Sequence, residues 1–382
     1  MRHQNSVFHG VLKHVPWAVF DRLVEEHGAD FRVRRLTTKD QFVALVYGQL
    51  SGASSLRELV AGLASHAGRL YHLGAAPARR STLGDANALR PSAVFAALFA
   101  EMVKGAHRGL RRKIADTTYL LDSTGVQLNS LSSDWARFSK GVCGAKMHVV
   151  YDPDADRPTF FSVSAANVND ITEAKAIPIE QGATYVFDLG YHDFAWWAQL
   201  ANAGCRIVTR FKKNTNLSVV KERPLPKDSG ILSDRVGYLS ERLARSRTNP
   251  FQDPVREVQV RTETGKVLRI LSNDIGASAQ EIADLYKRRW AIELFFRWVK
   301  QTLKITRFLG TNENAVRIQI AVALITFLLL RTAQAAQKII HSPLAFARLI
   351  RANLMHRRRI DRLLDPDPDP DSETDQLVLQ WV

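Results

Sequence analysis

Residues 119–122 read Tyr-Leu-Leu-Asp, and residues 185–188 read Tyr-Val-Phe-Asp. Both are short apolar runs of the kind that forms buried β-strands, and both end in an aspartate. Ligands bind beyond the carboxyl edge of an α/β sheet, so aspartates that follow neighbouring strands can converge there. The two stretches therefore predict a fold class and, at the same time, a candidate site.

Further strand-like runs and helical segments surround these two stretches. The predicted strands are residues 118–121, 146–151, 159–163, 185–187, 206–211 and 267–271. Helical segments at 171–177 and 193–203 lie between several of them, which is typical of an α/β sheet covered by helices. Before them, an all-helical N-terminal domain is predicted, with helices at 39–50, 56–64 and 91–104.

A third acid, Glu293, lies in a basic segment that we expect to form one long helix from about Ser278 to Thr302. At about 100° per residue, Glu293 shares a narrow stripe with Tyr286, Arg289 and Lys300. The residues predicted to pack on the sheet fall on the other side of this helix: Ala291, Ile292, Leu294, Phe295, Trp298 and Val299.

Three converging carboxylates repel one another unless a cation neutralises them, and Mg²⁺ is the usual occupant of such oxygen-rich sites. The sequence therefore predicts Asp122, Asp188 and Glu293 as catalytic residues and as ligands of Mg²⁺, for which Mn²⁺ can substitute. Two such ions on either side of a phosphate could activate the attacking oxygen and stabilise the leaving one. Glu293 is a lone acid among basic residues, which fits a metal ligand whose neighbouring cations bind phosphates.

The charge of the chain points to a polyanionic partner. The formal net charge is +15, although six acids lie together in the C-terminal tail: Asp365, Asp367, Asp369, Asp371, Glu373 and Asp375. The rest of the chain is more basic still, which favours nucleic acid as the partner. The Asp-Pro repeats of the tail are expected to be extended and solvated.

We expect a cytoplasmic, nucleoid-associated protein without a membrane partner, and cysteine usage and hydropathy fit the cytoplasmic location. Cys143 and Cys205 have no partner pattern, so no disulfide framework is expected. The longest apolar run, residues 320–330, is shorter than the roughly 18 residues of a membrane span and predicts a buried core helix. The first 20 residues lack the apolar core of a secretory signal.

The spacing Tyr286-x2-Arg289-x3-Glu293-x6-Lys300 resembles the Tyr-Arg-Glu-Lys signature of the insertion-sequence-four family of bacterial transposases, which belong to the Asp-Asp-Glu class. The resemblance covers about residues 80–310. It extends to three other segments: Leu121-Asp122-Ser123-Thr124, Phe187-Asp188-Leu189-Gly190-Tyr191 and Val208 to Asn214.

This resemblance implies an RNase H-like catalytic core interrupted by a β-rich insertion. It also implies double-stranded DNA as the partner, Mg²⁺-dependent cleavage at the terminal inverted repeats, strand transfer into target DNA, and a homodimer in the DNA complex. By position, Tyr286, Arg289 and Lys300 would hold phosphates, with Arg210, Lys212 and Lys213 as further DNA contacts. The expected parts are a helical DNA-binding region (1–112), the first part of the core (113–211), the insertion (212–272), the second part of the core with a helical region (273–362), and the acidic tail (363–382).

Other functions remain open on sequence grounds. His356-Arg357-Arg358-Arg359 matches an element of tyrosine recombinases, but the last tyrosine is Tyr286, so the nucleophile that must follow is absent. An RNase H-like metal-dependent nuclease would carry the same three acids. A non-catalytic DNA-binding regulator of transposition predicts a damaged acidic triad, whereas all three acids are present.

Overall fold

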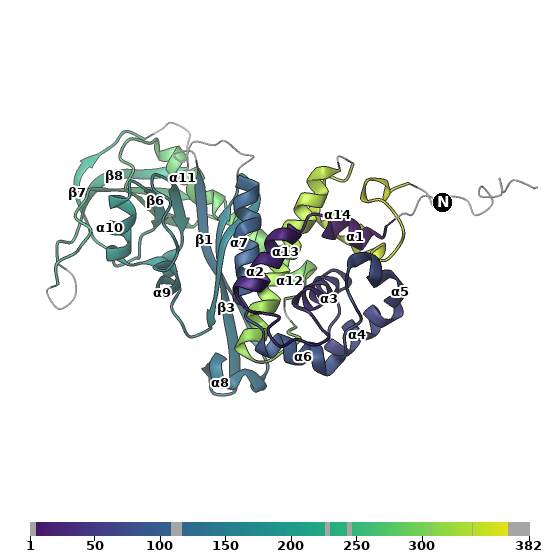
Figure 1. The fold of residues 1–382 in the computed structure, drawn as a ribbon. Coiled ribbons are helices and arrows are strands. Elements are labelled where there is room, and N and C mark those ends of the chain that lie inside the picture. The colour runs from purple at the N-terminus through teal and green to yellow at the C-terminus, as the bar shows by residue number, and fades with distance from the viewer. Residues whose placement is uncertain are drawn as a thin grey trace, which may run out of the picture.

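One long sheet organises the protein, and helices from both ends of the chain pack against one part of it (Figure 1). The structure is a computed structural model that describes residues 5–107, 117–225, 230–242, 247–305, 307–337 and 339–365. Its strands are β1 (Thr118–Leu128), β2 (Arg137–Ser139), β3 (Val142–Asp152), β4 (Arg157–Ala165), β5 (Thr184–Phe187), β6 (Arg206–Arg210), β7 (Leu217–Glu222), β8 (Ile231–Leu239), β9 (Val255–Arg261) and β10 (Val267–Ser272).

The first half of the sheet mixes antiparallel and parallel strands. β4, β3 and β1 pair antiparallel, whereas β5 and β6 run parallel to β1. The resulting order, β4-β3-β1-β5-β6, confirms the predicted α/β class and is consistent with an RNase H-like core. The parallel strands need crossover connections, and helices α9 (Asp170–Ala174) and α10 (Phe194–Asn202) lie in these connections.

Strand β1 is longer than predicted. The sequence indicated that it ends at Leu121, but it continues to Leu128. Only the parallel partner β5 stops there, since its last residue paired with β1 is Phe187, opposite Leu121. The antiparallel partner β3 continues to pair with β1 as far as Leu128, and these ladder hydrogen bonds keep the polar second half of β1 extended.

The second half of the sheet is built by the segment that the sequence marks as an insertion. β10 pairs with β6, and β9, β8 and β7 follow in antiparallel order, so these strands continue the main sheet. Buried charges are paired here: Arg256 donates to both carboxylate oxygens of Asp234 at 2.7 and 2.6 Å. Glu257 is fully buried and accepts from Arg235 at 2.6 Å and from Arg269. Such pairing lets a charged segment form buried strands.

The N-terminal helices pack around a helix from the other end of the sequence. They are α1 (Val7–Leu12), α2 (Trp17–Glu26), α3 (Thr38–Ser51), α4 (Leu56–Ser65), α5 (Ala67–Leu70), α6 (Arg80–Leu89) and α7 (Ala93–His107). Helix α13 (Glu313–Ala336) contacts α1, α3, α6 and α7. Residues 5–107 and the C-terminal helices therefore share one hydrophobic core.

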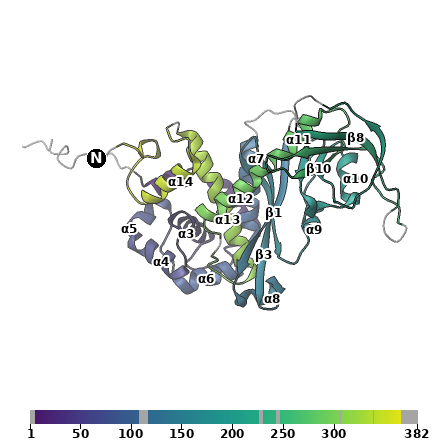
Figure 2. The ribbon, with the colours of Figure 1, turned by 180° about the vertical axis from the view of Figure 1, so that it is seen from behind.

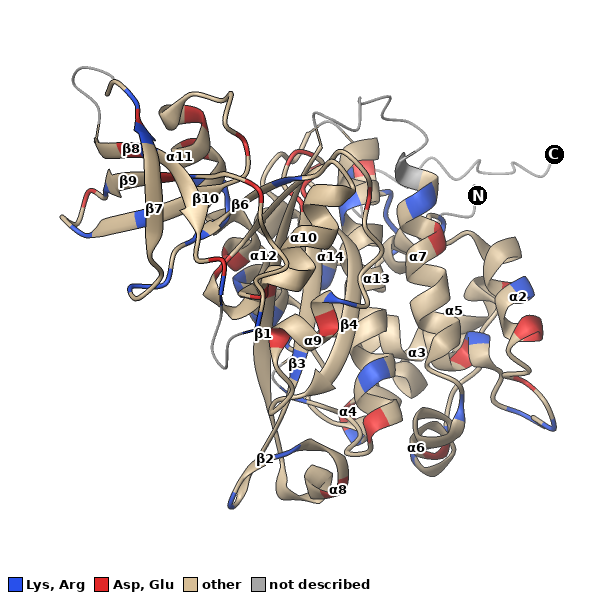
Figure 3. Cartoon of the chain, turned by 90° about the vertical axis from the view of Figure 1, so that its left-hand side faces the viewer, with Lys and Arg blue, Asp and Glu red and all other residues tan. Residues whose placement is uncertain are grey.

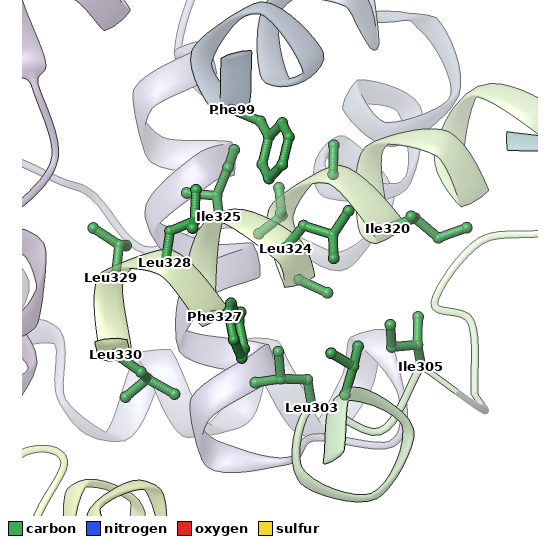
Figure 4. Packing of buried hydrophobic residues seen from close by; sticks show 14 of the residues in the cluster. Phe99, Leu303, Ile305, Ile320, Leu324, Ile325, Phe327, Leu328, Leu329 and Leu330 are labelled. Atoms are coloured by element: carbon green, nitrogen blue, oxygen red, sulfur yellow. The ribbon is translucent and has the colours of Figure 1, made fainter. Parts of the chain in front are cut away.

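Helix α13 confirms the predicted core helix but is longer than the apolar run alone suggested. By length and composition it could cross a membrane, yet 83% of its most apolar window is buried inside the protein. Figure 4 shows its apolar side chains between Phe99 of α7 on one side and Leu303 and Ile305 on the other. The extra length lies at both ends of the apolar run: residues 313–319, which follow the cap residue Asn312, and residues 331–336.

The prediction of one long helix from Ser278 to Thr302 is wrong in one respect, because the helix is broken at Arg289. The segment forms α11 (Ala279–Arg288) and α12 (Trp290–Thr302). At the break, tighter hydrogen bonds to the third preceding residue join Arg289 to Tyr286 at 3.1 Å and Ile292 to Arg289 at 3.2 Å. Leu294, which was expected to pack on the sheet, is 46% exposed, whereas Phe296, which was not in the expected set, is buried.

Candidate active site

The two strand-end aspartates lie side by side at one edge of the parallel strands. Leu121 of β1 pairs with Phe187 of β5, and Asp122 and Asp188 are the next residues of these two chains. Asp188 caps the short 3₁₀ helix Leu189–Tyr191, where its Oδ1 accepts a 2.8 Å hydrogen bond from the Gly190 N–H. The convergence that the sequence predicted for these two residues is therefore present.

Helix α12 brings the third acid to the same edge. Figure 2 shows α12 beside β1 and α11 beside β10. Arg289, at the break between the two helices, donates to Asp122 Oδ2 at 3.2 Å and also to Glu293. One guanidinium therefore joins the β1 carboxylate to the α12 carboxylate. Phe295 anchors α12 in this position through ring contacts with Tyr151 and Phe327, at 4.9 and 5.1 Å between centroids.

The electrostatics of this edge are those of crowded carboxylates. Burial raises the pKa of Asp122 to about 6, and the negative charges of Asp188 and Glu293 add to the rise. The Ser123 N–H and Arg289 act in the opposite direction without cancelling it. The edge therefore carries more negative charge than its own cation neutralises.

Tyr286 lies against Arg289, and Arg210 lies close to Tyr286. The guanidinium of Arg289 lies 5.9 Å from the centroid of the Tyr286 ring, and burial raises the pKa of the Tyr286 hydroxyl. Arg210 is the last residue of β6, so it reaches the same sheet edge, and its charge acts on Tyr286. Within the described part of the chain, the buried Nε atoms of Arg289 and Arg210 have no hydrogen-bond partner.

The predicted lysines lie further out. Lys300 Nζ donates to the carbonyl of Gly125 on β1 at 2.8 Å, three residues beyond Asp122. Lys212 and Lys213 follow β6 and are exposed, and the charge of Lys212 acts on His192 near the end of β5. Figure 3 shows basic and acidic segments close together where α12 and β1 meet.

Sequence reasoning missed a fourth acid, Asp170, at the start of α9. Its Oδ2 and the Oδ1 of Asp188 each lie 3.0 Å from the point that a Cβ on Gly190 would occupy. Lys146 of β3 donates to Asp170 Oδ1 at 2.9 Å and neutralises it. Asp170 follows no predicted strand end, so no local pattern singled it out.

A divalent cation site is not preassembled among the described residues, since no group of three or more Asp, Glu, His or Cys side chains is close enough to hold a metal ion. Arg289 already stands between Asp122 and Glu293. The donor set itself consists of hard carboxylate oxygens with uncompensated charge, which fits Mg²⁺ or Mn²⁺. Chemically, the edge can hold cations and place arginine and lysine donors beside a bound phosphate.

The fold and the site define an α/β protein with an acid-lined sheet edge surrounded by cations. The family model described as the transposase DDE domain matches residues 114–329, and the chain belongs to this family. A second model, described as a domain of unknown function, matches residues 3–76.

Relatives point to transposases of insertion sequences. A protein of Sinorhizobium fredii named as a transposase, y4zB, is 42% identical over 284 residues, which are 74% of this chain and 80% of that protein. A protein of Geobacillus stearothermophilus named as a transposase for insertion sequence element IS5377 is 31% identical over 63% of each chain. A cryo-EM structure of the piggyBac transposase synaptic complex with hairpin DNA has a TM-score of 0.46 and 11% identity, covering 97% of this chain and 84% of that one.

Proposed function

We propose that this transposase binds the terminal inverted repeats of its own insertion sequence, cleaves the ends with Mg²⁺ or Mn²⁺, and transfers them to target DNA. The observation that carries the proposal is the pairing of Leu121 with Phe187, which sets Asp122 beside Asp188, together with the Arg289 link from Asp122 to Glu293. The family model spans all three acids. The strand order β4-β3-β1-β5-β6 supports an RNase H-like core around them.

The three carboxylates are proposed as the ligands of the divalent cations. When bound, these ions would supply charge stabilisation at the reacting phosphate and activation of the attacking oxygen. The fold holds these carboxylates near one another in a partly buried site of low dielectric, where a bound cation relieves their mutual repulsion. The Ser123 N–H donates to Asp122 Oδ1 at 2.8 Å, and the Gly190 N–H fixes Asp188, so two of the three ligands are oriented by backbone groups.

The cations around the acids are proposed to position DNA. Arg289 can offer its donors to phosphate oxygens once its two carboxylates are otherwise neutralised. The ring of Tyr286 packs against the Arg289 guanidinium, and its hydroxyl can donate a hydrogen bond to a phosphate oxygen. Lys300, Arg210, Lys212 and Lys213 extend the basic surface along β1 and beyond β6, where they would contact further phosphates.

The proposal also includes the helical region 1–112 as a DNA-binding region, a homodimer in the complex with DNA, and a cytoplasmic, nucleoid-associated location. The formal net charge of +15 supports association with DNA. Mixing experiments with DNA ends in excess test the dimer: adding Asp122→Asn protein to a fixed amount of wild type should lower cleavage if two copies act together, and should leave it unchanged if each copy acts alone.

The test is a cleavage assay on a labelled inverted-repeat end with Mg²⁺ or Mn²⁺. Asp122→Asn, Asp188→Asn and Glu293→Gln should each lower the cleavage rate by about 10³-fold or more while end binding persists, because each removes a proposed metal ligand. The matched control is Glu26→Gln, an exposed acid of α2, which should cleave as wild type.

The products separate this proposal from its alternatives. Cleavage followed by joining to target DNA supports a transposase, whereas cleavage without joining indicates a nuclease. Equal end binding by the wild type and all three variants, with no cleavage by any of them, would indicate a regulator.

A further inference from the structure

The two ends of the described chain are joined in one structural unit. The backbone N–H groups of Val7 and Phe8 on α1 donate to the carbonyls of His356 and Leu354 at 3.0 and 2.8 Å. Arg69 also donates to the carbonyl of Met355. A Cβ on Gly10 would lie 2.9 Å from Ile360, so α1 rests closely on the segment that follows α14 (Pro343–Ala352). Figure 1 shows α1 beside α14 on the side of the helical region away from β7 and β8.

This junction lines an open pocket of about 560 Å³, which we call the terminal basic pocket. The charged or titratable side chains in its lining are His9, Lys13, Arg358, Arg359, Asp361 and Arg362. The lining thus holds four cationic side chains and one carboxylate. None of these residues belongs to the acid-lined edge formed by β1, β5 and α12.

Neutralisation within the pocket is incomplete. The one carboxylate of the lining, Asp361, is taken by Arg359, whose two donors reach it at 3.0 and 2.7 Å. Arg358 donates to the backbone carbonyl of Asp365 at 2.9 Å. The Arg362 guanidinium lies 4.0 Å from the Asp365 carboxylate, and both side chains are more than half exposed, so solvent weakens this ion pair. Lys13 pairs with no carboxylate among the described residues in the ion pairs of the structure, so the pocket keeps a positive potential.

The pocket is also open to a large polyanion. The side chains of Arg359 and Arg362 are 62% and 65% exposed, and Lys13 is exposed. Arginine offers planar donor pairs that match phosphate oxygens, and an exposed site can be reached by an extended backbone as well as by a small ion. Burial and then the charge of Lys13 lower the pKa of His9, so this histidine adds a neutral hydrogen-bonding group to the wall.

We propose that the terminal basic pocket binds backbone phosphates of duplex DNA at a place separate from the acid-lined edge. This inference rests on the proposed function, since it takes the same DNA as the partner. The joined N- and C-terminal segments thus form a phosphate site. The contact is independent of sequence, because backbone phosphates position a protein on DNA without specifying bases.

The experiment measures the binding of the full chain to a duplex carrying the inverted-repeat end, at several salt concentrations. The variant Lys13→Ala with Arg362→Ala is compared with the control Arg261→Ala with Lys266→Ala, which removes two exposed cations near the turn between β9 and β10, outside the pocket and the proposed DNA-binding regions. The pocket variant should bind about tenfold more weakly, and its salt dependence should fall by about one to two counterions, since each phosphate contact contributes a slope of about 0.9. The control should match the wild type.

Three outcomes separate the possibilities. Equal affinity and equal salt dependence of the pocket variant and the control would overturn this inference, while absence of DNA binding by the wild type would overturn the proposed function itself. Binding of inorganic phosphate in the pocket without binding of duplex DNA there would show a small-anion site and would overturn the inference. If the acidic tail of the chain is the occupant, truncation after Asp365 raises DNA affinity while the full-length pocket variant keeps wild-type affinity, and this too would overturn the proposal.

Discussion

The acid-lined edge and the terminal basic pocket use arginine in opposite ways. At the edge, Arg289 is held by Asp122 and Glu293, and the carboxylates outnumber the cation that contacts them. In the pocket, one carboxylate, Asp361, faces four cationic side chains. The first region therefore has excess negative charge in a partly buried place and calls for small cations. The second has excess positive charge at the surface and fits a polyanion.

The largest effect is expected from removing Arg289, the cation that contacts the carboxylates of the acid-lined edge. Arg289→Ala leaves Asp122 and Glu293 without their shared donor, so the protein should lose about 1–3 kcal/mol of stability. Cleavage should fall by about 10²- to 10³-fold because a phosphate donor is lost. The melting temperature should nevertheless rise more with Mn²⁺ than that of the wild type, since the unshielded carboxylates need a cation more. Thermal unfolding with and without Mn²⁺ measures this difference.

The control for that prediction is Arg317→Ala, which removes an arginine from an exposed pair with Glu313. It should change stability by less than about 0.5 kcal/mol and leave the response to Mn²⁺ unchanged. A response of Arg289→Ala no larger than that of the control would contradict the view that the edge lacks positive charge.

A smaller effect is expected from crowding the two carboxylates on either side of Gly190. A Cβ in Gly190→Ala would stand 3.0 Å from oxygens of Asp170 and Asp188, so one of them must move by a few tenths of an ångström. Small displacements of reacting groups are costly, and cleavage should fall by about tenfold with folding retained. Gly68→Ala is the matched control, because a Cβ there has no neighbour within 4 Å. Unchanged cleavage rates for Gly190→Ala would argue that Asp188 has no fixed position in the reaction.

The smallest effect at the edge is expected for Lys300. Its Nζ donates to the Gly125 carbonyl, so Lys300→Ala should cost at most about 1 kcal/mol of stability. End binding or cleavage should weaken by about fivefold to tenfold through loss of one phosphate contact. Binding titrations and thermal unfolding check the two parts separately. A large drop in melting temperature with normal binding would make Lys300 a structural residue instead.

The sequence predicted those features that depend on local pattern. The apolar runs that end at Asp122 and Asp188 located two neighbouring strands, and the spacing of Tyr286, Arg289 and Glu293 placed them on one side of a helical segment. The length of β1 was missed because its second half is held by pairing with β3, which residue patterns within β1 do not reveal.

Features that depend on contacts between distant segments were beyond the sequence. The helical pattern of the sequence continues through Arg289, but α11 contacts strands β5, β6, β8, β9 and β10 whereas α12 contacts β1, α13 and α14, and the break lies between them. Asp170 becomes relevant only because α9 brings it next to Gly190. The terminal basic pocket joins Lys13 to Arg362 across nearly the whole chain. In each case the decisive partner is remote in sequence.

The most direct test of the account is to locate bound Mn²⁺ by anomalous diffraction from crystals of the protein with an inverted-repeat end. The account predicts Mn²⁺ ligated by Asp122, Asp188 and Glu293, with Arg289 turned from its two carboxylates to a phosphate. A structure in which Arg289 still joins Asp122 to Glu293 and Mn²⁺ lies elsewhere, although the crystals cleave the DNA, would contradict it.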